Sequence, residues 1–259
     1  MSRSQDGQPK PNLITYNAAM SACEKGQQWR FALGLLEDVF CHQLQADVVT
    51  YSAAVSACEK GRQWRQALAL QEAAHRRKLA ADTITYNAAI SACEKASQWQ
   101  LALGLFASLL GKSMEPNTIT YNVAIGAFTQ GQQWRDALAL FHTLQEHSHL
   151  QPDLSTFTLV ISACDNPQQW AKALAMLCKM FQSSWEPEVA QYTGVMSACQ
   201  KASEWECAIA LLRRLFERAI EVNDVCYAVT IGACADAEQW RVAVALISEM
   251  DYMQVQIGG

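Results

Sequence analysis

The sequence contains ten cysteines, whose thiols could form disulfides or bind zinc. Six of them recur at intervals of 35 residues or a multiple of it, with one extra residue mid-chain: Cys23, Cys58, Cys93, Cys164, Cys199 and Cys234. This spacing does not gather four thiolates around one zinc ion, and no Cys-x-x-Cys pair occurs. Each follows small residues, as in Ser21-Ala22-Cys23. The pattern indicates a small buried core residue used once per structural unit, in a reducing compartment.

The histidines do not indicate catalysis either, because they do not recur at one position of this period: His42, His75, His142, His147 and His149. His147-x-His149 is a weak metal motif and more typical of a solvated loop. The sequence contains no Gly-rich phosphate loop, no Gly-x-Ser-x-Gly and no His-Glu-x-x-His. We therefore expect a binding protein that is not an enzyme, with no metal, cofactor or small-molecule substrate.

Composition narrows the class of protein further. Hydrophobic residues make up 51% and charged residues 17% of the 259 residues, which excludes a disordered chain. No apolar run approaches the roughly 18 residues of a membrane span, and residues 1–12 form a polar tail without the apolar core of a signal peptide. The net charge of −5 argues against broad, charge-driven binding to nucleic acid or anionic membranes, although it allows a local basic track.

The elements that position these residues follow a period of 35. Seven tryptophans mark it: Trp29, Trp64, Trp99, Trp134, Trp170, Trp205 and Trp240. An aromatic residue precedes each by thirteen positions: Tyr16, Tyr51, Tyr86, Tyr121, Phe157, Tyr192 and Tyr227. The one extra residue is expected in the stretch 147–151. The period defines seven units: residues 13–47, 48–82, 83–117, 118–153, 154–188, 189–223 and 224–258.

Each unit is predicted to be a helix-turn-helix. Tyr16, Met20 and Cys23 have the spacing of one helical face, and a second helix opens at Trp29 with Ala32 at its middle. Gly26 lies between the two helices, where a residue that tolerates positive φ is expected. One such hairpin cannot bury its apolar face alone, so the units must stack into a solenoid. We therefore predict an all-α fold.

The entry Thr15-Tyr16-Asn17, the closing pairs such as Pro116-Asn117 and the 35-residue period resemble the pentatricopeptide repeat family. The resemblance covers nearly the whole chain and recurs seven times; the Gln/Glu-Trp opening of the second helix departs from the commonest family pattern. It implies a right-handed α-solenoid superhelix that binds single-stranded RNA, one nucleotide per repeat. It further implies an adaptor in organelle RNA processing, stability or translation, in plastid or mitochondrion, with RNA-processing proteins as further partners.

By this resemblance two residues per repeat read a base by hydrogen bonding: the residue after the aromatic and the last residue of the unit. Asn17 with Asp47 implies U, Ser52 with Asp82 G, Asn87 with Asn117 C, Asn122 with Asp153 U, Thr158 with Glu188 G, and Thr193 with Asn223 A. Ala228 leaves the seventh unit unread. The implied target is 5′-UGCU(G)A-3′. Asn and Asp at helix starts are also ordinary capping residues, and capping alone is the open alternative.

Two further sets follow from the resemblance. Aliphatic residues that wedge between bases are Ile14, Val49, Ile84, Ile119 and Val225, while Ser155 and Ala190 replace them in units five and six. Lysines expected to contact phosphates are Lys25, Lys60, Lys95 and Lys201, although a lysine near a helix end also favours the helix dipole. We expect the Trp residues to pack between units. The rival function is a scaffold for protein–protein interaction without RNA binding, because a solenoid groove also holds peptides.

Overall fold

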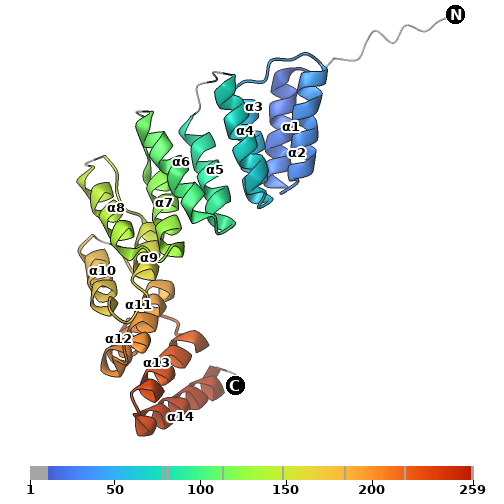
Figure 1. Cartoon of the computed structure of the whole chain (residues 1–259). Helices are drawn as coiled ribbons and strands as arrows, with labels where there is room; N and C mark the ends of the chain where they lie inside the picture. The colour runs from blue at the N-terminus through green and yellow to red at the C-terminus, as the bar shows by residue number, and fades with distance from the viewer. Residues whose placement is uncertain are drawn as a thin grey trace, which may run out of the picture. The chain divides into compact units, whose positions relative to one another are not determined.

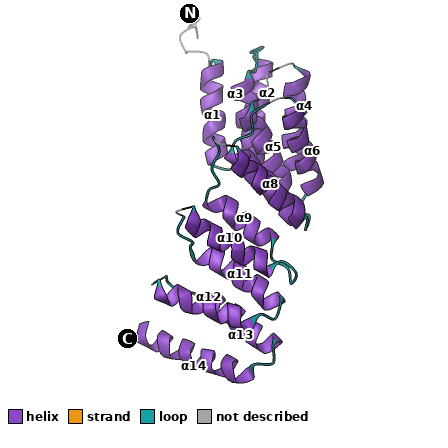
Figure 2. Cartoon of the chain, turned by 90° about the vertical axis from the view of Figure 1, so that its left-hand side faces the viewer, coloured by secondary structure: helices purple, strands orange, loops and turns teal. Residues whose placement is uncertain are grey.

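The computed structural model describes residues 11–257 except 78, 80, 81, 113, 148, 184 and 219, with side chains described as far as residue 250. Within this part the chain forms fourteen α-helices and no strand (Figures 1 and 2). The predicted all-α helical-repeat fold is confirmed. No helix in the described ranges combines the length and the apolar composition that a membrane span needs.

The helices alternate between two kinds. First helices begin at the first residue of each predicted unit: α1 (Leu13–Lys25), α3 (Val48–Lys60), α5 (Thr83–Lys95), α7 (Thr118–Gln130), α9 (Leu154–Ala163), α11 (Val189–Lys201) and α13 (Asp224–Asp236). Second helices all begin at the periodic tryptophan: α2 (Trp29–Cys41), α4 (Trp64–Arg76), α6 (Trp99–Gly111), α8 (Trp134–Glu146), α10 (Trp170–Gln182), α12 (Trp205–Glu217) and α14 (Trp240–Ile257). The extra residue lies between Glu146 and Leu154, as expected.

The chain forms two compact units, residues 1–127 and residues 128–259, and the same packing rule holds inside each. In the first unit α1 packs on α3 and α3 on α5, while each second helix packs on the first helix of its own repeat and of the next (Figure 1). In the second unit α9 packs on α11 and α11 on α13, with α10 and α12 placed in the same way. Within each unit, first helices therefore form one layer and second helices the other.

Small residues let the two layers approach closely. The alanine at the middle of the second helix is fully buried in six repeats: Ala32, Ala67, Ala102, Ala137, Ala173 and Ala208. Between repeats one and two, Tyr16 and Met20 pack with Tyr51 and Ala54 in one apolar cluster. Each hairpin thus buries its apolar side on its neighbours, which is how a solenoid obtains a continuous core.

Five of the six periodic cysteines belong to this core. Cys58, Cys93, Cys164 and Cys199 are fully buried, as is Cys234. Burial raises the pKa of the Cys58, Cys93 and Cys164 thiols to about 11 and that of Cys199 to about 12, so these thiols stay protonated at neutral pH. The predicted packing role is confirmed for these five, whereas Cys23 in the first repeat is only half-buried. The described residues contain no group of three or more side chains that would hold a metal ion.

The turn inside each hairpin corrects one prediction. Gly26 and Gly61 have φ near −80°. The positive φ belongs to the next residue, Gln27 in the first repeat and Arg62 in the second. The reason is the hydrogen-bond pattern: Gln28 N–H donates to Cys23 O and Gln27 N–H to Glu24 O, a Schellman motif that places the left-handed residue after the cap.

The glycine has a packing role instead. A Cβ at Gly61 would overlap Cδ1 and Cγ of Trp29, which belongs to the preceding repeat. Trp64 packs in the same manner against a cluster that includes Cys58 and Ala89, from its own and the following repeat. The prediction that these tryptophans pack between units is confirmed for both. Trp240 in the last hairpin is 67% exposed, since no described helix follows it.

Candidate nucleic-acid interface

The base-reading positions fall where consecutive repeats meet. The first residue of each pair is the fifth residue of a first helix, and its partner is the N-cap of the next first helix. In the first repeat Asn17 Nδ2 donates to Asp47 Oδ1 at 3.3 Å. Asp47 also caps α3, because its Oδ1 accepts from Thr50 N at 2.8 Å. Capping and contact with the preceding repeat therefore coexist in one side chain, and the capping alternative is not exclusive.

Asp47 is held ionised in this arrangement. Burial opposes its charged form, but hydrogen bonds from the Thr50 backbone and side chain and from Asn17 outweigh burial and lower the pKa of Asp47. The carboxylate is thus an acceptor at neutral pH, and the amide of Asn17 supplies the donor that faces it.

The third repeat repeats the pairing with a neutral partner. Asn87 Nδ2 donates to Asn117 Oδ1 at 3.2 Å, and the Thr120 hydroxyl donates to the same oxygen at 2.9 Å. Asn87 is 8% exposed and its Oδ1 is buried without a hydrogen-bond partner. Burying an acceptor unpaired is costly, so a donor that reached this oxygen would relieve that cost.

A cavity of about 220 Å³ lies at this pair. Its lining includes Asn87 and Asn117 together with Ile84 and Ile119, two of the expected wedge residues. Both isoleucines are largely exposed, at 64% and 60%. The cavity therefore combines hydrogen-bonding groups with two apolar side chains, which is what the edge and the faces of one nucleobase require.

The wedge positions are exposed in every repeat where an aliphatic residue occupies them. Besides the two isoleucines, Ile14 is 77%, Val49 56% and Val225 54% exposed. Exposed aliphatic side chains at one register position have no packing role in the chain. Within residues 1–127, four of them, on successive first helices, can cover the faces of a ligand's bases.

The structure does not join the other pairs in this way. Ser52 Oγ donates to Val49 O of its own helix, and Asp82 accepts from Thr85. Thr193 Oγ1 donates to Val189 O, while Asn223 caps α13 by accepting from Cys226 N at 3.0 Å. For none of Ser52–Asp82, Thr158–Glu188 and Thr193–Asn223 does a direct hydrogen bond link the two side chains among the described residues. Asn122 and Asp153 come from the same repeat but lie in different compact parts of the chain, residues 1–127 and 128–259, and their pairing stays a prediction.

In repeat five, the base-reading residue Thr158 contacts Gln191 of the next repeat. Thr158 Oγ1 donates to Leu154 O at 2.8 Å and accepts from Gln191 Nε2 at 2.7 Å. Gln191 occupies the place that threonine holds in the earlier repeats, and its Oε1 accepts from Glu188 N at 2.8 Å. The residue expected to pair with Thr158 thus gives way to one that the sequence did not single out.

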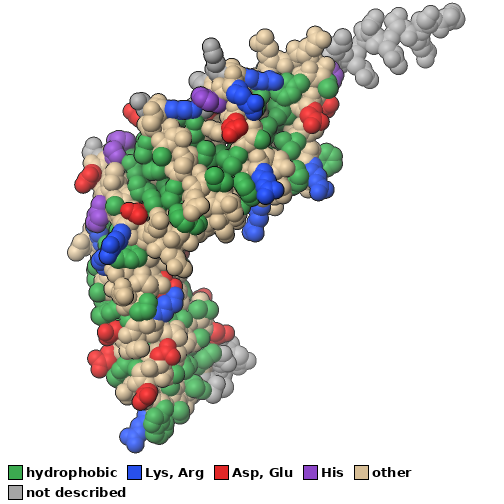
Figure 3. Space-filling view, viewed as in Figure 1, with side chains coloured by type: hydrophobic (Ala, Val, Ile, Leu, Met, Phe, Trp, Pro, Cys, Tyr) green, Lys and Arg blue, Asp and Glu red, His purple; other side chains and the backbone are tan. Residues whose placement is uncertain are grey.

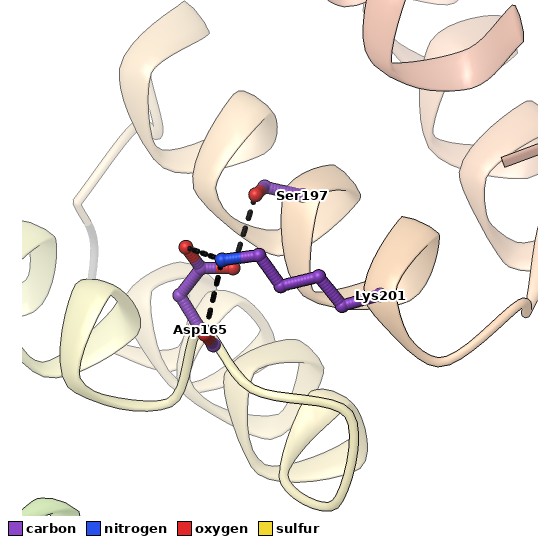
Figure 4. A network of polar contacts seen from close by, with 3 residues as sticks. All are labelled: Asp165, Ser197 and Lys201. Atoms are coloured by element: carbon purple, nitrogen blue, oxygen red, sulfur yellow. Dashed lines mark hydrogen bonds and ion pairs between the residues drawn. The ribbon is translucent and has the colours of Figure 1, made fainter. Parts of the chain in front are cut away.

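The four lysines divide into two kinds. Lys95 Nζ lies 2.5 Å from Glu59 Oε1, and Lys201 Nζ lies 2.6 Å from Asp165 Oδ2. Ser91 donates to the Glu59 carboxylate and Ser197 to that of Asp165, so each acid holds a small network between successive repeats. Figure 4 shows the network at Asp165. Lys25 and Lys60 are exposed and form no ion pair with the described residues. A phosphate would have to compete with an acidic residue for Lys95 and Lys201 but not for Lys25 or Lys60.

Sequence reasoning missed the residues that organise these contacts. Thr50 and Thr120 were visible as the threonine that directly precedes Tyr51 and Tyr121, but nothing in that pattern indicated which polar atoms they contact. The acid of the inter-repeat networks was also missed. Its signal is that Glu59 and Asp165 precede Lys95 and Lys201 by 36 residues, one repeat and one position.

Fold and site together define a class: an α-helical repeat protein with polar side-chain pairs at two described repeat junctions and an exposed aliphatic residue at the same position of five repeats. Family models match consecutive parts of the chain: "Pentatricopeptide repeat domain" over residues 34–95, "PPR repeat family" over 81–130 and "PPR repeat" over 119–149. Together these models cover residues 34–149 and identify that stretch as pentatricopeptide repeats. Among curated proteins no sequence matches it at a significant level.

Solved structures share the fold. Maize pentatricopeptide repeat protein PPR10 is similar with a TM-score of 0.58 and 24% identity over 86% of this chain and 32% of that one. PPR10 in complex with an 18-nucleotide psaJ RNA element gives a TM-score of 0.61 and 15% identity over 92% and 40%. The PPR domain of Arabidopsis thaliana PRORP1, in complex with tRNA, gives 0.60 and 17% over 66% and 90%. This chain thus spans about a third of the length of maize PPR10.

Proposed function

We propose that this protein binds single-stranded RNA, one nucleotide per repeat, with 5′-UGCU(G)A-3′ as its preferred sequence. The observation that carries the proposal is the cavity at the third repeat. There Asn87 offers an unpaired buried oxygen beside Asn117, and Ile84 and Ile119 complete the lining. A cytosine fits this chemistry because its exocyclic amino group can donate to Asn87 Oδ1.

The solved structures of two similar folds with RNA support the same proposal, since the compared region is the repeat array itself. Binding rather than catalysis is the proposed role of this region. We further propose, from the family alone, an adaptor role in organelle RNA processing, stability or translation, which import of a fluorescent fusion into plastids or mitochondria would test.

The test is fluorescence-anisotropy titration of the protein with 5′-UGCUGA-3′ in a neutral spacer. The reversed sequence and the same sequence as DNA are the controls. We expect tighter binding to the RNA in the forward direction. The double variant Asn87→Thr with Asn117→Asp should shift the preference at the third base from C to G. Equal or absent binding to all oligonucleotides at low salt would refute RNA binding and favour a protein-binding solenoid.

A further inference from the structure

One threonine hydroxyl in the first repeat junction contacts both members of the base-reading pair. Thr50 Oγ1 lies 2.8 Å from Asn17 Oδ1 and 2.7 Å from Asp47 Oδ1. Thr50 is fully buried, so these are the acceptors among which its single proton is shared. Asn17 Nδ2 meanwhile donates to Asp47 Oδ1. The Asn17 amide is therefore fixed in orientation, with its oxygen towards Thr50 and its nitrogen towards Asp47.

The same position acts at other junctions. Thr120 donates to Asn117 Oδ1, the oxygen that also receives Asn87 Nδ2, and in this way leaves Asn87 Oδ1 unpaired. At repeat five Gln191 donates to Thr158 Oγ1 and is 2% exposed. In each case the third residue of a first helix, on the repeat that follows, contacts the pair of the repeat before it.

We propose that this third residue, Thr50, Thr120 or Gln191, is a positioning residue that decides which polar atoms the base-reading pair presents. The inference rests on the proposed function. Asn17, held by Thr50, keeps a free N–H and a free lone pair in fixed places, which complements uracil with its N3–H donor and neighbouring carbonyl acceptor. Cytosine presents an acceptor at N3. If the Asn17 amide could rotate by 180° and exchange its oxygen and nitrogen, it would bind uracil and cytosine equally.

The chain supplies a matched control. Thr15 makes the same capping box as Thr50: Asn12 Oδ1 accepts from Thr15 N at 3.0 Å and from its hydroxyl at 2.7 Å. Within the described residues Thr15 contacts no base-reading side chain. Thr15→Val and Thr50→Val therefore remove the same hydroxyl contacts of a capping box and keep the backbone bond to the N-cap side chain, but only Thr50→Val frees a base-reading amide.

The experiment compares U with C at the first base of 5′-UGCUGA-3′ by anisotropy titration for wild type, Thr50→Val, Thr50→Ser and Thr15→Val, with thermal unfolding of each. We expect Thr50→Val to lower the U-over-C preference by about threefold to tenfold, the range that one hydrogen bond accounts for. Thr50→Ser and Thr15→Val should keep the preference.

Two results would overturn the inference. If wild type prefers U and Thr50→Val keeps that preference in full, the hydroxyl positions nothing and the proposed function stands. If Thr15→Val loses the preference equally, the effect is one of helix capping. A wild type without any preference at the first base would instead refute base reading at this repeat, and that outcome is recognised from wild type alone.

Discussion

At the scale of single residues, the interface depends on side chains that contribute nothing to the packed core. Ile84 is 64% exposed yet lines the cavity beside Asn87. Exposed aliphatic side chains at one register in five repeats have a solvation cost that only a ligand relieves. In contrast to these exposed side chains, the polar residues Asn87 and Thr50 are buried, and their contacts are fixed before a ligand binds.

Replacement of Ile84 tests the wedge role. Ile84→Ala should weaken binding of 5′-UGCUGA-3′ by roughly 1 kcal/mol, about fivefold, because less apolar area covers the base. Thermal unfolding should change little, since the side chain is exposed in the free protein. Leu101→Ala is the control: Leu101 is 43% exposed on α6 in the same unit and does not line the cavity. Equal losses of affinity in both variants would contradict the wedge role.

At the scale of the element, the turn between the two helices of a repeat fixes how repeats stack. Gly61→Ala should destabilise the protein by about 1–3 kcal/mol, because the new Cβ would overlap Cδ1, Cγ and Cβ of Trp29. Gly34→Ala is the control, since Gly34 lies inside α2 and an added Cβ would meet nothing within 4 Å; it should stabilise by about 0.5–1 kcal/mol. Urea unfolding measures both. Equal stability of Gly61→Ala and wild type would show that Trp29 moves aside freely.

The elements were largely predictable from sequence and the contacts between them were not. Trp29 and Tyr16 recur with a fixed period, so helix number and register follow from spacing. The position of the left-handed residue did not follow, because glycine content suggested Gly26 whereas the Schellman hydrogen bonds place it at Gln27. The hydrogen-bond partner of Thr158 was not predictable either. The repeat pattern pairs Thr158 with Glu188 and gives no sign that Gln191 contacts it from the next repeat.

At the scale of the whole molecule, charge contributes little to the proposed binding. The net charge is −5, and on the face shown in Figure 3 Lys and Arg side chains are scattered among acidic and apolar ones in both units. Affinity for RNA would then come mainly from contacts with bases. This is the reverse of a basic RNA-binding protein, in which phosphates dominate and sequence matters less.

The salt dependence of binding measures how much phosphate contacts contribute relative to base contacts. Each phosphate neutralised on a single strand adds about 0.7 to the slope of log K against log salt. Lys25 and Lys60 alone predict a slope of roughly −1.4, and all four lysines roughly −2.8. We expect the smaller value, because Lys95 and Lys201 are ion-paired with Glu59 and Asp165.

Titrations between about 50 and 200 mM salt give this slope for wild type and two variants. Lys60→Gln should reduce it by about 0.7, the contribution of one phosphate. Lys95→Gln is matched to it in position and charge and should leave the slope unchanged, since Lys95 already faces a carboxylate. An equal change in both variants would mean that RNA displaces Glu59 from Lys95, and a slope near −2.8 in wild type would mean that it also displaces Asp165 from Lys201.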